Sequence, residues 1–143
     1  MSFYLNVLSI KSNFFSGIVK KIHISSTEGE LGIYPNHSPL LTLIKPCKLY
    51  ILDKNNIEEY IYISGGILEV QPKNVSILAD KAIKGIDLNY KKIILLKNKF
   101  QNIIKKSSKI DKNFLANSLT LLKIKIQLKV IELTKNIQSN NKF

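Results

Sequence analysis

The alternation of hydrophobic and polar residues changes character once along the chain, near Gly85. Before that point, apolar residues alternate with polar ones or cluster in runs of about four to eight residues, which is typical of short β-strands. The runs are residues 3–8, 18–24, 40–44, 48–52, 59–63, 67–70 and 75–79. Turn-forming residues separate them, including a Gly65-Gly66 pair that permits positive φ angles. Many short strands at this spacing predict an antiparallel β-sandwich.

After Gly85 the spacing becomes helical, and neither Gly nor Pro occurs between Asp87 and Asn140. Apolar residues recur at steps of three and four, as on one face of a helix. The two stripes are Ile93, Leu96, Phe100 and Ile103, and then Leu115, Leu119, Leu122, Ile126, Val130, Leu133 and Ile137. Asp87 and Asp111 precede the two stretches and are the expected N-cap residues. We therefore predict an α+β fold, with a β-sandwich over residues 1–86 and an antiparallel two-helix hairpin with a frayed end over residues 87–143.

The second predicted helix is apolar on more than one side. Four apolar residues lie off its main stripe, namely Leu121, Ile124, Leu128 and Ile131. Because two helices cannot cover all of this surface, the helix must either pack on the β-domain or have a second surface to visit. Of the two alternatives, we favour packing on the β-domain.

The net charge of +12 raises the question of nucleic-acid binding. All 22 basic residues are lysines, whereas dedicated readers of DNA or RNA usually keep arginine, whose planar fork pairs bidentately with guanine and phosphate. Tyr60 and Tyr62 share a strand face, but Glu58 lies on the same face and would repel phosphate. A nucleic-acid module and a basic β-domain adaptor therefore stay open as alternative functions.

The sequence offers no catalytic or metal-binding constellation. It has no glycine-rich phosphate loop and no nucleophile elbow, and Glu58 and Glu59 are neighbours on a strand and so face opposite ways. The single cysteine, Cys47, starts an apolar run and is expected to be a buried, inert thiol. With two distant histidines we expect no metal site and no cofactor. We also expect no signal peptide and no membrane span.

Two long motifs resemble the epsilon subunit of bacterial F-type ATP synthase. The first covers residues 28–41 (EGELGIYPNHSPLL) and the second residues 63–80 (ISGGILEVQPKNVSILAD), and residues 127–135 are similar to the last helix of that family. The resemblance implies a non-catalytic rotor subunit of the central stalk. Such a subunit couples c-ring rotation to the catalytic head and lies at the cytoplasmic face of the bacterial inner membrane, which it reaches only through the complex.

The resemblance also implies where the β-sandwich makes its contacts. In that family the sandwich binds the gamma subunit, and a loop touches the polar loops of the c-ring. Pro35 and Pro39 are expected to stiffen this loop into one exposed tip that carries Glu30, Asn36 and His37. The candidate ring contacts are Glu30, Tyr34, Asn36, His37 and Ser38.

The helical hairpin resembles the mobile C-terminal domain of the family, which can extend along gamma toward the alpha and beta subunits and restrain ATP hydrolysis. Lys123, Lys125 and Lys129 are then candidates for transient contact with an acidic loop of the head. A nucleotide motif of many family members opens the first helix, but here Asn89 replaces its acid and Lys92 its arginine. Lysine lacks the bidentate fork of arginine, so we expect no ATP sensing.

Overall fold

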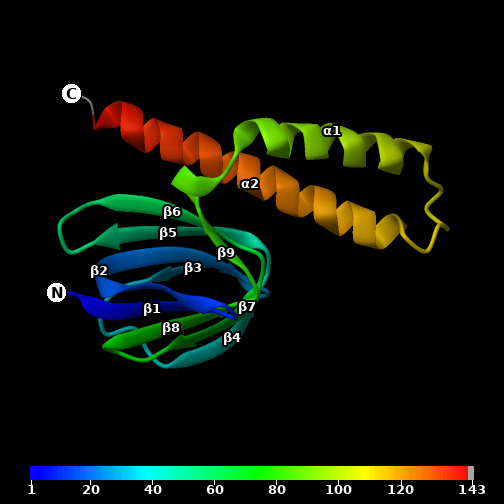
Figure 1. Ribbon diagram of the computed structural model, residues 1–143. Helices are drawn as coiled ribbons and strands as arrows, with labels where there is room; N and C mark the ends of the chain where they lie inside the picture. The colour runs from blue at the N-terminus through cyan, green and yellow to red at the C-terminus, as the bar shows by residue number, and fades with distance from the viewer. Residues whose placement is uncertain (142–143) are drawn as a thin grey trace.

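The computed structural model describes residues 1–141 and contains a β-domain followed by two helices (Figure 1). The elements are β1 (Phe3–Ser9), β2 (Ser12–Ser26), β3 (Gly29–Ile33), β4 (Leu40–Ile44), β5 (Cys47–Asp53), β6 (Glu58–Ile63), β7 (Gly66–Val70), β8 (Asn74–Ala79), β9 (Ala82–Lys84), the short 3-10 helix η1 (Gly85–Asp87), α1 (Tyr90–Lys106) and α2 (Phe114–Asn140). The predicted α+β fold is confirmed. The predicted frayed end of the hairpin includes residues 142 and 143, which lie outside the described residues.

The strands form a sandwich in which β2 belongs to both layers. One layer has the order β1-β8-β7-β4, and the other has the order β2-β5-β6-β9, with β3 paired to β2. The first half of β2 pairs with β1, and its second half pairs with β3 and β5. This long strand therefore connects the two layers by hydrogen bonds to strands of both. The sandwich was predicted to be antiparallel, but one pair of strands, β1 and β8, is parallel. They can do so because more than sixty residues separate them, enough for a crossover.

The core between the layers follows the alternation seen in the sequence. Along β1, β5 and β8 every second side chain points inward and is buried, as expected for a sheet with one covered face. β6 is different, because Ile61, Tyr62 and Ile63 are all buried. A strand with three consecutive buried side chains must be covered on both faces, and α2 supplies the second cover.

The glycine pair between β6 and β7 has the backbone predicted for it. Gly65 and Gly66 have φ angles of 130° and 150°, a region that residues with a side chain rarely adopt. The pair lets the chain cross from one layer to the other in a single tight step.

The predicted helix caps are wrong. Asn89 caps α1, because its side-chain oxygen accepts a hydrogen bond from the Lys92 backbone N–H at 3.2 Å. Asp87 lies earlier, in η1. Asp111 lies in the turn between the helices, where its carboxylate accepts a hydrogen bond from the Asn113 N–H at 2.9 Å, and α2 begins only at Phe114.

α2 lies between α1 and the sheet that contains β5 and β6 (Figure 1). Its off-stripe residues Ile124, Leu128 and Ile131 pack with residues of α1. From Leu122 onward, the main stripe faces the sandwich. The helix therefore has two apolar faces, one packed against α1 and the other against the β-domain. The packing on the β-domain that we favoured is confirmed.

Candidate interaction surfaces

The turn after β3 presents three of the predicted ring contacts. The His37 N–H donates to the Tyr34 carbonyl at 3.2 Å, and Asn36 between them has a φ of 64°. Pro35 at the second position and a left-handed Asn36 at the third are typical of a type II turn. The Asn36 N–H also donates to the Pro72 carbonyl of the β7–β8 loop at 3.0 Å. The turn is therefore tied to a second loop, which makes it a stiff surface feature.

The His37 ring is oriented by the backbone of the next residue. Its Nδ1 lies 2.7 Å from the carbonyl oxygen of Ser38. Because a carbonyl oxygen can only accept, Nδ1 carries the proton in this contact and Nε2 remains as the second polar atom of the ring. The ring-contact role of Tyr34, Asn36, His37 and Ser38 stays a prediction.

Glu30 does not lie on this turn. It is the second residue of β3, and its Oε1 accepts a hydrogen bond from the Ser25 hydroxyl of β2 at 2.6 Å. The structure separates it from Asn36 and His37 by the length of the strand, so the prediction of one tip carrying all three is wrong. The cause is that Gly29 and Gly32 suggested a loop, whereas only Gly29 has a positive φ.

An apolar row crosses the outer face of the β1-β8-β7-β4 layer. Leu43 pairs with Ile67, Ile67 with Leu78 and Leu78 with Leu8, so the four side chains are direct cross-strand neighbours. Leu43, Ile67 and Leu78 are 59%, 42% and 52% exposed. The outer face of a sheet that meets only water is normally polar, so this row is suited to a protein partner.

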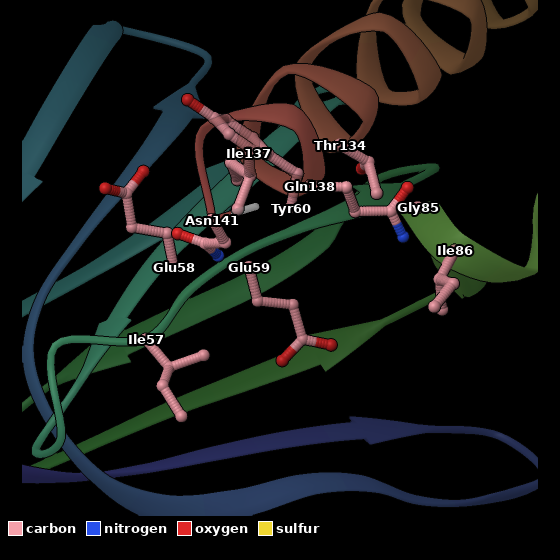
Figure 2. Close-up of a pocket in the computed structure, with 10 residues that line it drawn as sticks. All are labelled: Ile57, Glu58, Glu59, Tyr60, Gly85, Ile86, Thr134, Ile137, Gln138 and Asn141. Carbon is pink, nitrogen blue, oxygen red and sulfur yellow. The ribbon is translucent and has the colours of Figure 1, made fainter. Parts of the chain in front are cut away.

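A pocket of about 270 Å³ lies where the sandwich meets the end of α2 (Figure 2). Its lining residues are Ile57, Glu58, Glu59, Tyr60, Gly85, Ile86, Thr134, Ile137, Gln138 and Asn141. Glu59 lies 3.8 Å from the Lys84 amine, and the carboxylates of Glu58 and Glu59 point in different directions (Figure 2). The pocket marks the junction between the two parts of the chain.

A second pocket at the same junction is lined by residues that the sequence analysis assigned to different partners, the c-ring and the catalytic head. Glu30 of β3 and Lys129 of α2 both line it, together with Lys48 of β5. The Lys129 amine also lies 3.4 Å from Glu132 on its own helix. Lys125 is exposed and Lys123 is half-buried. The head-contact role of Lys123, Lys125 and Lys129 stays a prediction.

The replaced nucleotide motif has a structural role of its own. Asn89 is the N-cap of α1, as described above, and asparagine is among the best residues for that position. Lys92 is exposed in the first turn of the helix. A cation there is unfavourable for the helix dipole, and among residues 1–141 this amine makes no ion pair.

A row of aromatic rings on the β2-β5-β6 layer was missed from the sequence. The rings of His23 and Tyr50 lie 5.4 Å apart and those of Tyr50 and Tyr60 lie 5.2 Å apart, measured between centroids. His23 pairs with Tyr50 and Tyr50 with Tyr60 across three strands. No local pattern could have revealed the row, because it depends on the register between strands.

Cys47 is a buried thiol, as predicted, at the edge of the sandwich core. Burial raises its pKa to about 11, an effect that a hydrogen bond with the Ser25 backbone only partly offsets. The thiolate is the reactive form of cysteine, so the folded chain should react slowly with alkylating reagents at neutral pH.

The raised pKa of Cys47 predicts a loss of stability at high pH. Between pH 9.0 and about 11 the unfolded chain has lost a proton that the folded chain retains, so the free energy of unfolding falls as pH rises. At 1.36 kcal/mol per pKa unit, the loss is about 2–3 kcal/mol. Urea unfolding at pH 8 and pH 11 checks this: the Cys47→Ala variant should lose less stability than the unaltered chain by this amount. Equal losses would contradict it.

Residues 1–141 contain no cluster of three or more His, Cys, Asp or Glu side chains that could hold a metal ion. In the same residues, no helix is long and apolar enough to cross a membrane.

The comparison with protein families identifies the β-domain. The model described as "ATP synthase, Delta/Epsilon chain, beta-sandwich domain" matches residues 2–85. The chain belongs to this family. The match covers the nine described strands up to Gly85, the residue at which η1 begins.

Solved structures extend the likeness of this ATP synthase delta/epsilon family member to the helices. A chain in the OSCP/F1/c-ring structure of the Euglena gracilis mitochondrial ATP synthase is 19% identical with a TM-score of 0.70, covering 94% of this chain and 80% of that one. A chain in the central stalk/c-ring structure of the Tetrahymena thermophila mitochondrial ATP synthase is 12% identical with a TM-score of 0.58, covering 92% of this chain and 97% of that one. At these identities the likeness shows the fold.

Proposed function

We propose that this chain is a non-catalytic subunit of the central stalk of a proton-translocating ATP synthase and couples c-ring rotation to the catalytic head. The family match over residues 2–85 carries this proposal. Two chains that share its fold over more than nine-tenths of its length come from structures of ATP synthase stalk and c-ring assemblies, which supports it. The subunit would be peripheral, at the cytoplasmic face of a bacterial inner membrane.

The gamma subunit docks on the apolar row of Leu8, Leu43, Ile67 and Leu78. The row is exposed and lies on the layer opposite the one that α2 covers, so both faces of the sandwich would be occupied in the complex. Exposed aliphatic side chains in direct contact with each other suit the apolar centre of a protein interface.

The c-ring contact lies on the turn of Tyr34, Asn36, His37 and Ser38. Two hydrogen bonds hold this turn in a fixed conformation, so its polar groups form a rigid surface. Such a surface would align the subunit with the repeated loops of the ring, and it would contribute less to the strength of binding. Glu30 is left out of this contact, because it lies in β3 beside the hairpin.

The helices form a separate regulatory unit that restrains ATP hydrolysis. Leu115 and Leu119 continue the main stripe of α2 beyond the sandwich and stay exposed, which leaves apolar surface for the head. Lys123 and Lys125 follow on the same helix and provide positive charge for an acidic partner loop.

Reconstitution tests this function. Membranes whose ATP synthase has lost this subunit should hydrolyse ATP without pumping protons efficiently, and adding the purified chain should restore pumping. A variant with Lys91→Ala, at an exposed residue of α1 outside the proposed contacts, should restore it equally well. If the chain binds the depleted membranes but leaves pumping unchanged, the coupling role is wrong.

The aromatic row favours a second candidate, a platform for single-stranded nucleic acid. Stacked rings beside Lys21 resemble a base-stacking surface. However, the groove that contains the row is lined by Glu30 and Glu58 as well as by Lys21 and Lys48, so it has no net positive charge. Because phosphate binding depends on such charge, we rank this candidate second.

A further inference from the structure

Gly85 lies where the chain leaves the sandwich and passes beneath α2. It is buried, and it faces Thr134 of α2 at the side of the pocket in Figure 2. A Cβ atom at residue 85 would overlap the Thr134 hydroxyl oxygen and would lie only 3.1 Å from the Thr134 Cβ and from the Tyr60 carbonyl oxygen. Its φ is not in the left-handed region, so this glycine is needed for space and not for backbone conformation.

Thr134 cannot simply turn away from an added side chain. Its hydroxyl donates to the Val130 carbonyl one helical turn earlier at 2.8 Å, and rotation about χ1 would break that bond. The two approaches of 3.1 Å, to the Thr134 Cβ and to the Tyr60 carbonyl, are relieved by a shift of a few tenths of an ångström, so the overlap with the hydroxyl oxygen is the contact that forces a larger movement. A side chain at residue 85 is therefore accommodated by moving α2.

Moving α2 would uncover a defined part of the sandwich. Tyr62 points outward from β6 and is 1% exposed, because α2 covers this face of the strand. Val130 is fully buried and follows Leu122 and Ile126 along the same side of the helix. The junction therefore has an apolar centre, and Gly85 and Thr134 lie beside it, toward the C-terminal end of the helix.

We propose that the Gly85–Thr134 contact positions α2 on the sandwich, so that the folded arrangement of the hairpin depends on the absence of a side chain at residue 85. Any larger residue there favours the arrangement in which α2 is released. The contact lies within the chain, so this inference holds whether or not the proposed rotor function is correct.

The reactivity of Tyr62 reports release in the isolated full chain. Mild nitration followed by mass spectrometry gives a rate for each tyrosine, and the exposed Tyr4 and Tyr34 serve as internal standards. Gly85→Ala should raise the Tyr62 rate about tenfold relative to these standards, which corresponds to about 1.4 kcal/mol. Gly17→Ala is the matched control, because a Cβ there meets only Phe15 at an ordinary 3.7 Å.

A second substitution separates this mechanism from general damage. Thr134→Ala removes the oxygen that the new Cβ would overlap, so the double variant with Gly85→Ala should return to within about twofold of Thr134→Ala alone. The proposal is overturned if Gly85→Ala leaves the Tyr62 rate unchanged. It is equally overturned if Thr134→Ala does not relieve the effect, including the case in which both the single and the double variant fail to fold.

Discussion

A chain that carries both Leu43→Glu and Ile67→Glu is expected to bind the gamma subunit at least about 100-fold more weakly than the unaltered chain. The two side chains are neighbours at the centre of the exposed apolar row. Hot-spot side chains at protein interfaces contribute about 2 kcal/mol each or more, and each 1.4 kcal/mol is a tenfold change in affinity. Calorimetric titration of gamma with each chain measures the effect.

The control for this experiment is Leu95→Glu. Leu95 is 69% exposed, like the residues of the row, but lies on α1. It should leave affinity within about twofold, because an exposed side chain outside the interface has little effect on binding. Unchanged affinity of the double variant, with its fold confirmed by circular dichroism, would show that gamma docks elsewhere.

Gly66→Ala is expected to be the most damaging single substitution of a glycine in the sandwich. An added Cβ would overlap the Leu78 carbonyl oxygen and approach the Ala79 Cα to 3.0 Å, and φ is already 150°. Backbone atoms in a sheet cannot move aside independently, so we expect a loss of at least about 3 kcal/mol, or failure to fold. Urea unfolding followed by circular dichroism measures it.

Gly29→Ala separates the two causes of this effect. Gly29 also has a positive φ, of 128°, but a Cβ there would meet nothing within 4 Å. It should cost only the backbone strain, about 1–2 kcal/mol. Equal losses for the two variants would mean that the close packing around Gly66 contributes nothing.

The sequence predicted the strands whose apolar residues have a clear period. Those at residues 40–44, 59–63 and 75–79 match β4, β6 and β8 closely. β3 was missed because Gly29 and Gly32 suggested a turn, and β9 because three residues are too few to show a period. The first half of β2 is polar apart from its phenylalanines and shows no alternation of apolar and polar residues. The sequence therefore did not predict that it pairs with β1.

The surfaces were harder to predict than the strands. The apolar row, the aromatic row and the Gly85–Thr134 contact each join residues far apart in the sequence. Which side chains become neighbours depends on strand register and on where α2 crosses the sheet, and neither is encoded in local periodicity. The two apolar faces of α2 were visible in advance, but their two partners were not.

The most direct test of the central claim is co-purification of the full chain with the gamma subunit of the same organism at moderate salt. The rotor account predicts a stable one-to-one complex, because the docking face is apolar and little affected by salt. A chain that does not bind gamma, but binds single-stranded nucleic acid with an affinity that falls steeply as salt rises, would contradict it.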